Sequence, residues 1–113
     1  MVIIMLWEKI KELEEKKKEL EEKITNLEKL LKELPNGHLE AKQINGKTYY
    51  YLRYWEDGRL KSKYIGKDPK DIERELKESQ QLRSQLSLLK QEREKINRVL
   101  IRIMNILDEN LFS

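Results

Sequence analysis

The first third of the chain carries an unbroken heptad pattern. Apolar residues recur at alternating steps of four and three from Leu6 to Leu34, and only Lys17 interrupts them. The positions that flank this seam carry opposite charges, with Lys9, Lys16 and Lys23 on one side and Glu14, Glu21 and Glu28 on the other. Four heptads with ordered flanking charges predict one helix of a coiled coil, over about residues 2–34. The run Pro35-Asn36-Gly37 ends this helix, because these residues do not continue it comfortably.

A second helix is predicted at the other end of the chain, over residues 69–111. It opens with an N-cap acid, a first-turn proline and a further acid at Asp68, Pro69 and Asp71. The heptad pattern resumes at Leu82 and runs to Leu107. Upstream, Ile72 and Leu76 are out of phase with that pattern, so we expect the first turns to face the segment between the helices.

The two heptad segments match in length at roughly 33 residues, or about 50 Å of helix, which favours an antiparallel hairpin. At the end where the chain termini meet, both helices are too apolar for a two-helix seam, and we expect self-association into a homodimer or a higher homo-oligomer. Docking of a partner protein is the alternative. The expected interface consists of Ile3, Leu6, Val99, Leu100, Ile103, Ile106 and Leu107.

The composition favours a fold with a narrow apolar seam rather than one with a thick hydrophobic core. Charged residues make up 40% of the 113 residues and hydrophobic residues 38%. Leu, Ile, Val and Phe still account for about 28%, above the roughly 20% typical of disordered chains. We therefore predict a mainly α protein, a single domain over residues 1–113, in which an antiparallel two-helix coiled coil carries a three-stranded antiparallel β-meander at residues 38–66 between its helices.

Enzymatic chemistry is not expected. The chain has no cysteine, and its one histidine, His38, has no acidic or thiol neighbours at ligand spacing. The four glycines follow no phosphate-loop spacing. We predict no catalytic residues, no cofactor and no metal. The longest apolar run, Val2 to Trp7, is far too short for a membrane span, and a cytoplasmic protein is expected.

The middle segment holds the charge excess of the chain. Residues 38–67 carry seven basic and three acidic side chains, whereas the flanking segments together stand at −1. All five tyrosines and one of the two tryptophans also lie here. Asn45-Gly46 is typical of a two-residue hairpin turn. For the second turn, a two-residue Asp57-Gly58 loop and a three-residue loop over residues 56–58 are both possible, and we favour the longer one because it leaves one sheet face consistently apolar.

In that register the apolar face is covered by Ile72 and Leu76, and the opposite face is basic and aromatic. Cations can contact phosphates, and rings can contact bases or sugars, so this face is the candidate nucleic-acid surface. The alternative is that these residues have a purely structural role, in which the aromatic residues favour β-strand formation and the lysines prevent aggregation at the sheet edges. The candidate binding residues are Lys42, Tyr49, Tyr51, Arg53, Trp55, Arg59, Lys61 and Lys63.

The stretch from Gly37 through Glu78 resembles a known DNA-binding module. Its turns Asn45-Gly46 and Asp57-Gly58 and the run from Tyr49 to Tyr54 are similar to the three-stranded arm-type domain of tyrosine recombinases, and to Tyr- and Lys-rich hairpin modules of small archaeal and mobile-element proteins. The resemblance implies that the exposed sheet face enters the DNA major groove. In architecture, two antiparallel helices joined by a hairpin are also similar to the β-type prefoldin subunit.

We therefore predict a non-enzymatic, nucleic-acid-binding protein, with DNA a more probable ligand than RNA and duplex DNA the expected form. The coiled coil would serve oligomerisation. A structural or adaptor protein, including a prefoldin-like chaperone, is the alternative.

Overall fold

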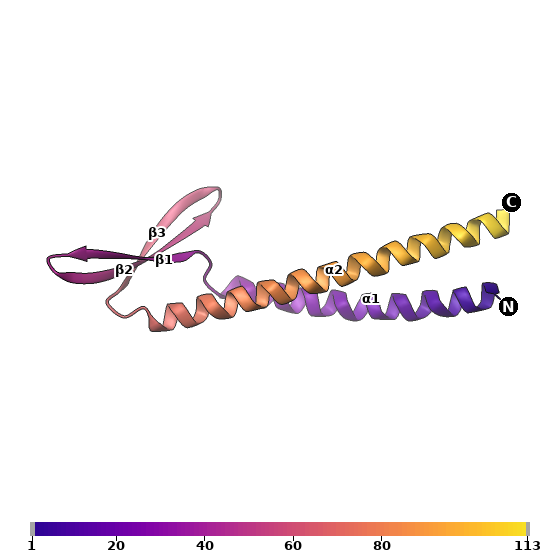
Figure 1. Cartoon of the computed structure of the whole chain (residues 1–113), viewed down its shortest axis with the longest axis horizontal. Helices are drawn as coiled ribbons and strands as arrows, with labels where there is room; N and C mark the ends of the chain where they lie inside the picture. The colour runs from indigo at the N-terminus through magenta and orange to yellow at the C-terminus, as the bar shows by residue number, and fades with distance from the viewer. Residues whose placement is uncertain (1, 113) are drawn as a thin grey trace. The chain divides into compact units, whose positions relative to one another are not determined.

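The protein consists of two long helices and one small sheet (Figure 1). A computed structural model describes residues 2–112. The elements are α1 (Val2–Glu33), β1 (His38–Ile44), β2 (Lys47–Glu56), β3 (Arg59–Gly66) and α2 (Lys70–Phe112). The predicted fold class is confirmed, with every element within two residues of its expected bounds. The chain divides into a helical unit, Met1–Glu28 with Gln85–Ser113, and a sheet unit, Lys29–Ser84.

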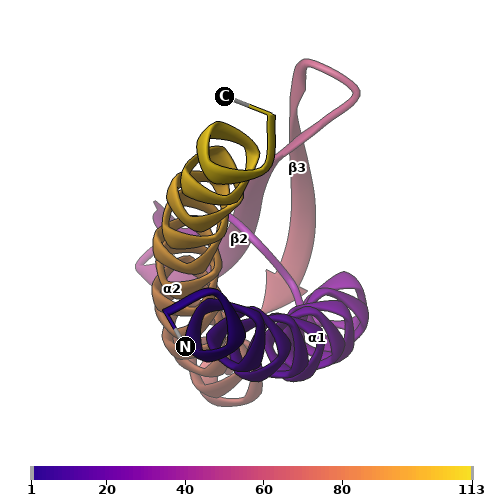
Figure 2. The same ribbon diagram turned by 90° about the vertical axis from the view of Figure 1, so that its right-hand side faces the viewer.

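In the helical unit, α1 and α2 lie beside each other and run antiparallel (Figure 2). The heptad positions of both helices form its core, with Leu6, Leu13 and Leu89 packed against them. The buried members are Ile10, Leu20, Ile96, Leu100, Ile103 and Leu107. The coiled-coil prediction is therefore confirmed, since hydrophobic residues at the predicted spacing exclude water along one seam.

This core also contains part of the predicted oligomer interface. Leu100, Ile103 and Leu107 are at most 8% exposed, and Leu6 packs against the same cluster. These four residues take part in the chain's own helix pairing. The other three members of the expected interface, Ile3, Val99 and Ile106, are exposed.

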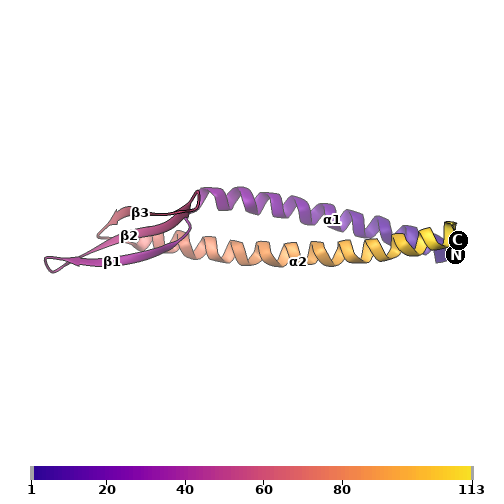
Figure 3. The ribbon, with the colours of Figure 1, turned by 90° about the horizontal axis from the view of Figure 1, so that it is seen from above.

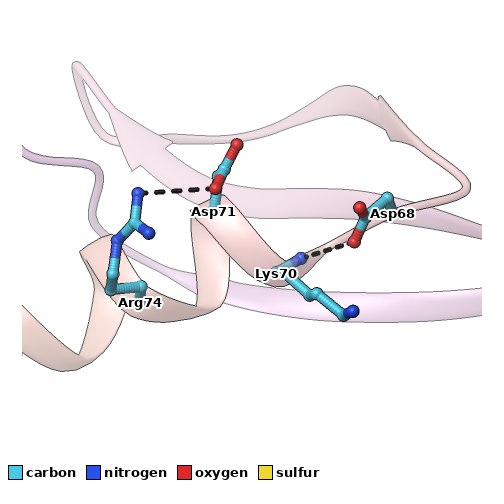
Figure 4. Close-up of polar contacts among 4 residues, drawn as sticks. All are labelled: Asp68, Lys70, Asp71 and Arg74. Carbon is cyan, nitrogen blue, oxygen red and sulfur yellow. Dashed lines mark hydrogen bonds and ion pairs between the residues drawn. The ribbon is translucent and has the colours of Figure 1, made fainter.

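In the sheet unit, α2 begins with the predicted cap (Figure 4). The Asp68 carboxylate accepts a hydrogen bond from the Lys70 backbone N–H at 3.1 Å, and the Glu73 N–H donates to the Pro69 carbonyl at 2.8 Å. Arg74 Nη2 lies 3.4 Å from Asp71 Oδ1. The Asp68 carboxylate thus satisfies one of the free N–H groups, and the acids of the first turn, Asp71 and Glu73, lie at the positive end of the helix dipole.

The strands form one antiparallel sheet in the order β1-β2-β3, and the first turns of α2 run alongside it (Figure 3). Leu52 in the central strand is 5% exposed, and Ser79 on α2 is 2% exposed. Ile72 and Leu76, which were expected to cover the sheet, are half-buried. The face that carries Leu52 is therefore the covered face of the sheet.

The connection from α1 to β1 depends on Gly37. Its backbone is in the left-handed region, at φ 101°, and passes close to β2. A Cβ atom at this position would lie within van der Waals overlap of the Arg53 carbonyl oxygen, at 2.0 Å. Glycine is required here both by conformation and by space.

Replacement of Gly37 tests this contact. Gly37→Ala should lower the free energy of unfolding by several kcal/mol, on the order of 3, because the backbone of β2 must move. Gly58→Ala is the matched control, since Gly58 also has positive φ but an added Cβ would meet nothing within 4 Å. It should cost only about 1 kcal/mol. Urea unfolding followed by circular dichroism measures both, and equal losses would contradict the close approach.

Candidate nucleic-acid interface

Both hairpins of the sheet turn in two residues. Asn45 and Gly46 have φ values of 53° and 77°, and Asp57 and Gly58 have 52° and 73°. Positive φ at both central positions is the signature of a type I′ turn, whose twist matches that of the flanking strands. The turn expected at Asn45-Gly46 is confirmed. The three-residue loop expected at residues 56–58 is wrong, because the turn comprises Asp57 and Gly58 alone.

The shorter turn reverses the faces of β3. Trp55 pairs with Leu60, Tyr54 with Lys61 and Leu52 with Lys63. Because successive side chains alternate between faces, a shift of one residue moves every side chain of the strand to the other side. Three of the eight candidate binding residues therefore lie on the face of Leu52, namely Arg59, Lys61 and Lys63.

The register changes once more at the end of β3. Tyr51 pairs with Tyr64 and Tyr50 with Gly66, which leaves Ile65 as the additional residue of a β-bulge. Gly66 has φ 113°, a conformation that suits glycine. Tyr64 thus stays on the face of Tyr51, directly across from it.

We call the face opposite Leu52 the aromatic face. It contains five of the eight candidate residues, Lys42, Tyr49, Tyr51, Arg53 and Trp55, together with side chains from all three strands that share their register. The additional members are His38, Glu40, Ile44, Lys47, Leu60, Ser62 and Tyr64.

Three tyrosines form the centre of the aromatic face. The Tyr51 and Tyr64 ring centroids lie 5.3 Å apart at an interplanar angle of 53°, and those of Tyr49 and Tyr64 lie 6.3 Å apart at 45°. These tilted arrangements fall in the favourable range for aromatic pairs. Lys42 Nζ lies 4.9 Å from the Tyr51 centroid and Lys67 Nζ lies 5.9 Å from that of Tyr49. The cluster thus brings ring surfaces and ammonium groups together through cation–π contacts.

The end of the aromatic face nearest the second turn is open. Trp55 is 66% exposed, and its cross-strand neighbour Leu60 is 46% exposed. Between Trp55 and Tyr51 lies Arg53, whose Nη1 is 3.5 Å from Glu40 Oε2. This ion pair is partly exposed and therefore contributes little to stability, but it holds the guanidinium on the aromatic face.

The other face presents cations without rings along β3. Arg59, Lys61 and Lys63 are all exposed, and Lys61 Nζ lies 3.3 Å from Glu56 Oε2. The candidate binding residues are thus divided between two surfaces. One is the aromatic face, which carries a few cations, and the other is a basic edge on the reverse side of β3.

Leu60, Tyr64 and Lys67 are among the contributors to the aromatic face that the predicted set lacked. Leu60 and Tyr64 were assigned to the covered face because of the longer turn. The Asp57-Gly58 dipeptide is itself a type I′ signal and would have placed both correctly. Lys67 follows the last strand, where alternation no longer predicts direction.

Residues 2–112 include no group of three or more His, Asp or Glu side chains arranged to hold a metal ion. Among the same residues, no helix is long and apolar enough to cross a membrane.

Residues 10–75 of the sequence match DUF6788, a domain of unknown function, and this match covers more than half of the chain. The chain belongs to the DUF6788 family. The DUF6788 match includes most of α1, the whole sheet and the start of α2. No curated protein and no solved structure matches the sequence.

A disulfide across β2 and β3 tests the register of this DUF6788 sheet. Trp55→Cys combined with Leu60→Cys should oxidise readily, because these residues directly oppose each other next to a two-residue turn, where Cβ atoms lie about 4.5–5.5 Å apart. The chain has no cysteine that could interfere. Tyr54→Cys with Leu60→Cys is the matched control for the longer turn. Mass spectrometry after oxidation measures both, and preferential closure of the control pair would contradict the observed register.

Proposed function

We propose that the protein binds nucleic acid through the aromatic face of its sheet, with DNA as the expected ligand, and that it acts in the cytoplasm. The observation that carries this proposal is the tyrosine cluster with lysines over its rings. An exposed face that combines ring surfaces with ammonium groups offers contacts to bases or sugars and to phosphates at the same time.

The charge of the face supports an anionic ligand. Lys42, Lys47 and Arg53 lie on it, Lys67 borders it, and Glu40 is its one acid among the described residues. Because Glu40 already pairs with Arg53, the lysines remain available to a phosphate backbone. Each neutralised phosphate releases counterions, so binding should weaken as salt rises.

Matched pairs of substitutions test which side of the sheet binds. Lys42→Ala with Arg53→Ala removes two cations of the aromatic face and should weaken DNA binding by about thirtyfold or more at roughly 0.15 M salt, at about 1 kcal/mol or more for each of the two contacts. Lys61→Ala with Lys63→Ala removes the same charge from the other face and should leave affinity nearly unchanged. Fluorescence anisotropy with a labelled oligonucleotide measures both.

Equal losses for the two pairs would mean that net charge alone drives association, and the aromatic face would lose its assigned role. Absence of binding at low salt would overturn the proposal. The structural or adaptor role, in which the sheet contacts protein, would then be favoured.

We also propose that the helical unit associates with a second copy of itself. Nine large apolar side chains near the α1 start and on the last turns of α2 are 40–70% exposed. At on the order of 100 Å² each, they approach the roughly 800 Å² per partner of a standard interface. They are Val2, Ile3, Ile4, Met5, Trp7, Val99, Ile101, Met104 and Ile106.

Surface and core substitutions on α2 distinguish association from folding. Ile101→Glu with Met104→Glu should lower the particle mass and preserve the helical signal, because both side chains are more than half exposed. Ile103→Asp should instead abolish much of that signal, because it places a charge in the core at 7% exposure. Analytical ultracentrifugation and circular dichroism measure these effects. If the variant with Ile101→Glu and Met104→Glu keeps its helical signal and its particle has the same mass as the parent, self-association is contradicted.

A further inference from the structure

We infer that the ligand of the aromatic face is single-stranded nucleic acid, whose bases stack on Trp55 and on the tyrosine cluster. This inference rests on the proposed function and names its substrate class. It differs from the duplex DNA expected from the sequence, because the observed register changes what the face offers.

The exposed rings offer flat surfaces to a ligand. Trp55 is 66% exposed and Tyr64 is 55% exposed, so much of both side chains is accessible. A base in a duplex already has its faces covered by its neighbours, whereas a base in a single strand can place a face on an aromatic ring. Leu60, across from Trp55, extends this platform with a further exposed apolar side chain.

The spacing of the platform suits an extended strand. Trp55 and Tyr51 lie four residues apart on the same face of β2, roughly 13 Å at about 3.3 Å per residue. Arg53 lies between them, 30% exposed and held by Glu40. Two stacking positions with a guanidinium between them allow bases to contact rings while the intervening backbone contacts a cation.

The cation count also favours a single strand. A surface with Arg59, Lys61 and Lys63 on it would resemble a duplex-binding sheet, in which phosphate contacts provide most of the affinity. The two-residue turn places these three side chains on the other face. Ring contacts must then provide a larger share of the affinity, and each stacked base contributes about 1–3 kcal/mol.

The test measures how tightly the full-length protein binds one oligonucleotide of mixed sequence, first as a single strand and then as a duplex with its complement. Trp7→Phe in the background leaves Trp55 as the sole tryptophan. The free strand should bind more tightly than the duplex and should quench Trp55 fluorescence. The log–log salt slope should be shallow, with a magnitude of about 1.4–2.8 for two to four phosphate contacts at roughly 0.7 per contact.

Substitution of the ring identifies its role. Trp55→Ala should weaken single-strand binding about 5- to 150-fold, the equivalent of one stacked base at about 1–3 kcal/mol. Trp55→Phe should restore part of the affinity because it retains an aromatic face. Lys61→Ala with Lys63→Ala is the control and should leave affinity unchanged. Since Trp55 is mostly exposed, these variants should keep the circular dichroism spectrum of the parent.

The outcomes separate this inference from the proposed function. Tighter binding of the duplex, or single-strand binding indifferent to Trp55→Ala, would overturn base stacking and leave nucleic-acid binding in place. If neither the single strand nor the duplex binds at low salt, both the inference and the proposed function are overturned.

Discussion

The turn at Asp57-Gly58 fixes which side chains of β3 share a face of the sheet with which side chains of β2. A type I′ turn needs positive φ at two successive residues, and aspartate followed by glycine meets this need at low cost. Once the turn comprises two residues, Tyr64 must share a face with Tyr51, and Lys63 must share one with Leu52. The place of Tyr64 in the tyrosine cluster and the separate basic edge both follow from this one turn.

The structure has the two-residue turn, although a three-residue loop would have kept one sheet face consistently apolar. The shorter turn is tolerated because β3 is an edge strand. A lysine beside buried Leu52 would be costly in a central strand, where burial of an unpaired charge is strongly unfavourable. On the edge, Lys61 and Lys63 stay exposed, and their long side chains keep the ammonium groups in water. The mixed face therefore has little cost, whereas a longer loop would forgo the turn that the dipeptide favours.

Local signals predicted most of the fold, and competition between signals explains what they missed. The heptads at Ile10 and Ile96 and the cap at Asp68 each depend on near neighbours in the chain, and all were found in the structure. The helical core, by contrast, includes residues expected to contact a second copy, because a heptad pattern does not say which partner covers it. The approach of Gly37 to the backbone of Arg53 depends on tertiary packing, and nothing local to Gly37 beyond a helix ending indicated it.

In the proposed nucleic-acid binding, the cations on the reverse side of β3 would still attract an approaching polyanion, although they would not contact a ligand on the aromatic face. A single sheet layer is about 10 Å thick. The Debye length is about 10 Å at 0.1 M salt, similar to this thickness, and about 30 Å at 0.01 M, well beyond it. At low salt, Arg59, Lys61 and Lys63 would therefore add to the attraction at the aromatic face and accelerate association. Near physiological salt their field is screened, and only side chains in contact with the ligand remain effective. In the proposed function, the positive charge of the middle segment would thus serve long-range attraction over the whole sheet, whereas selection among ligands would depend on the rings and cations of one face.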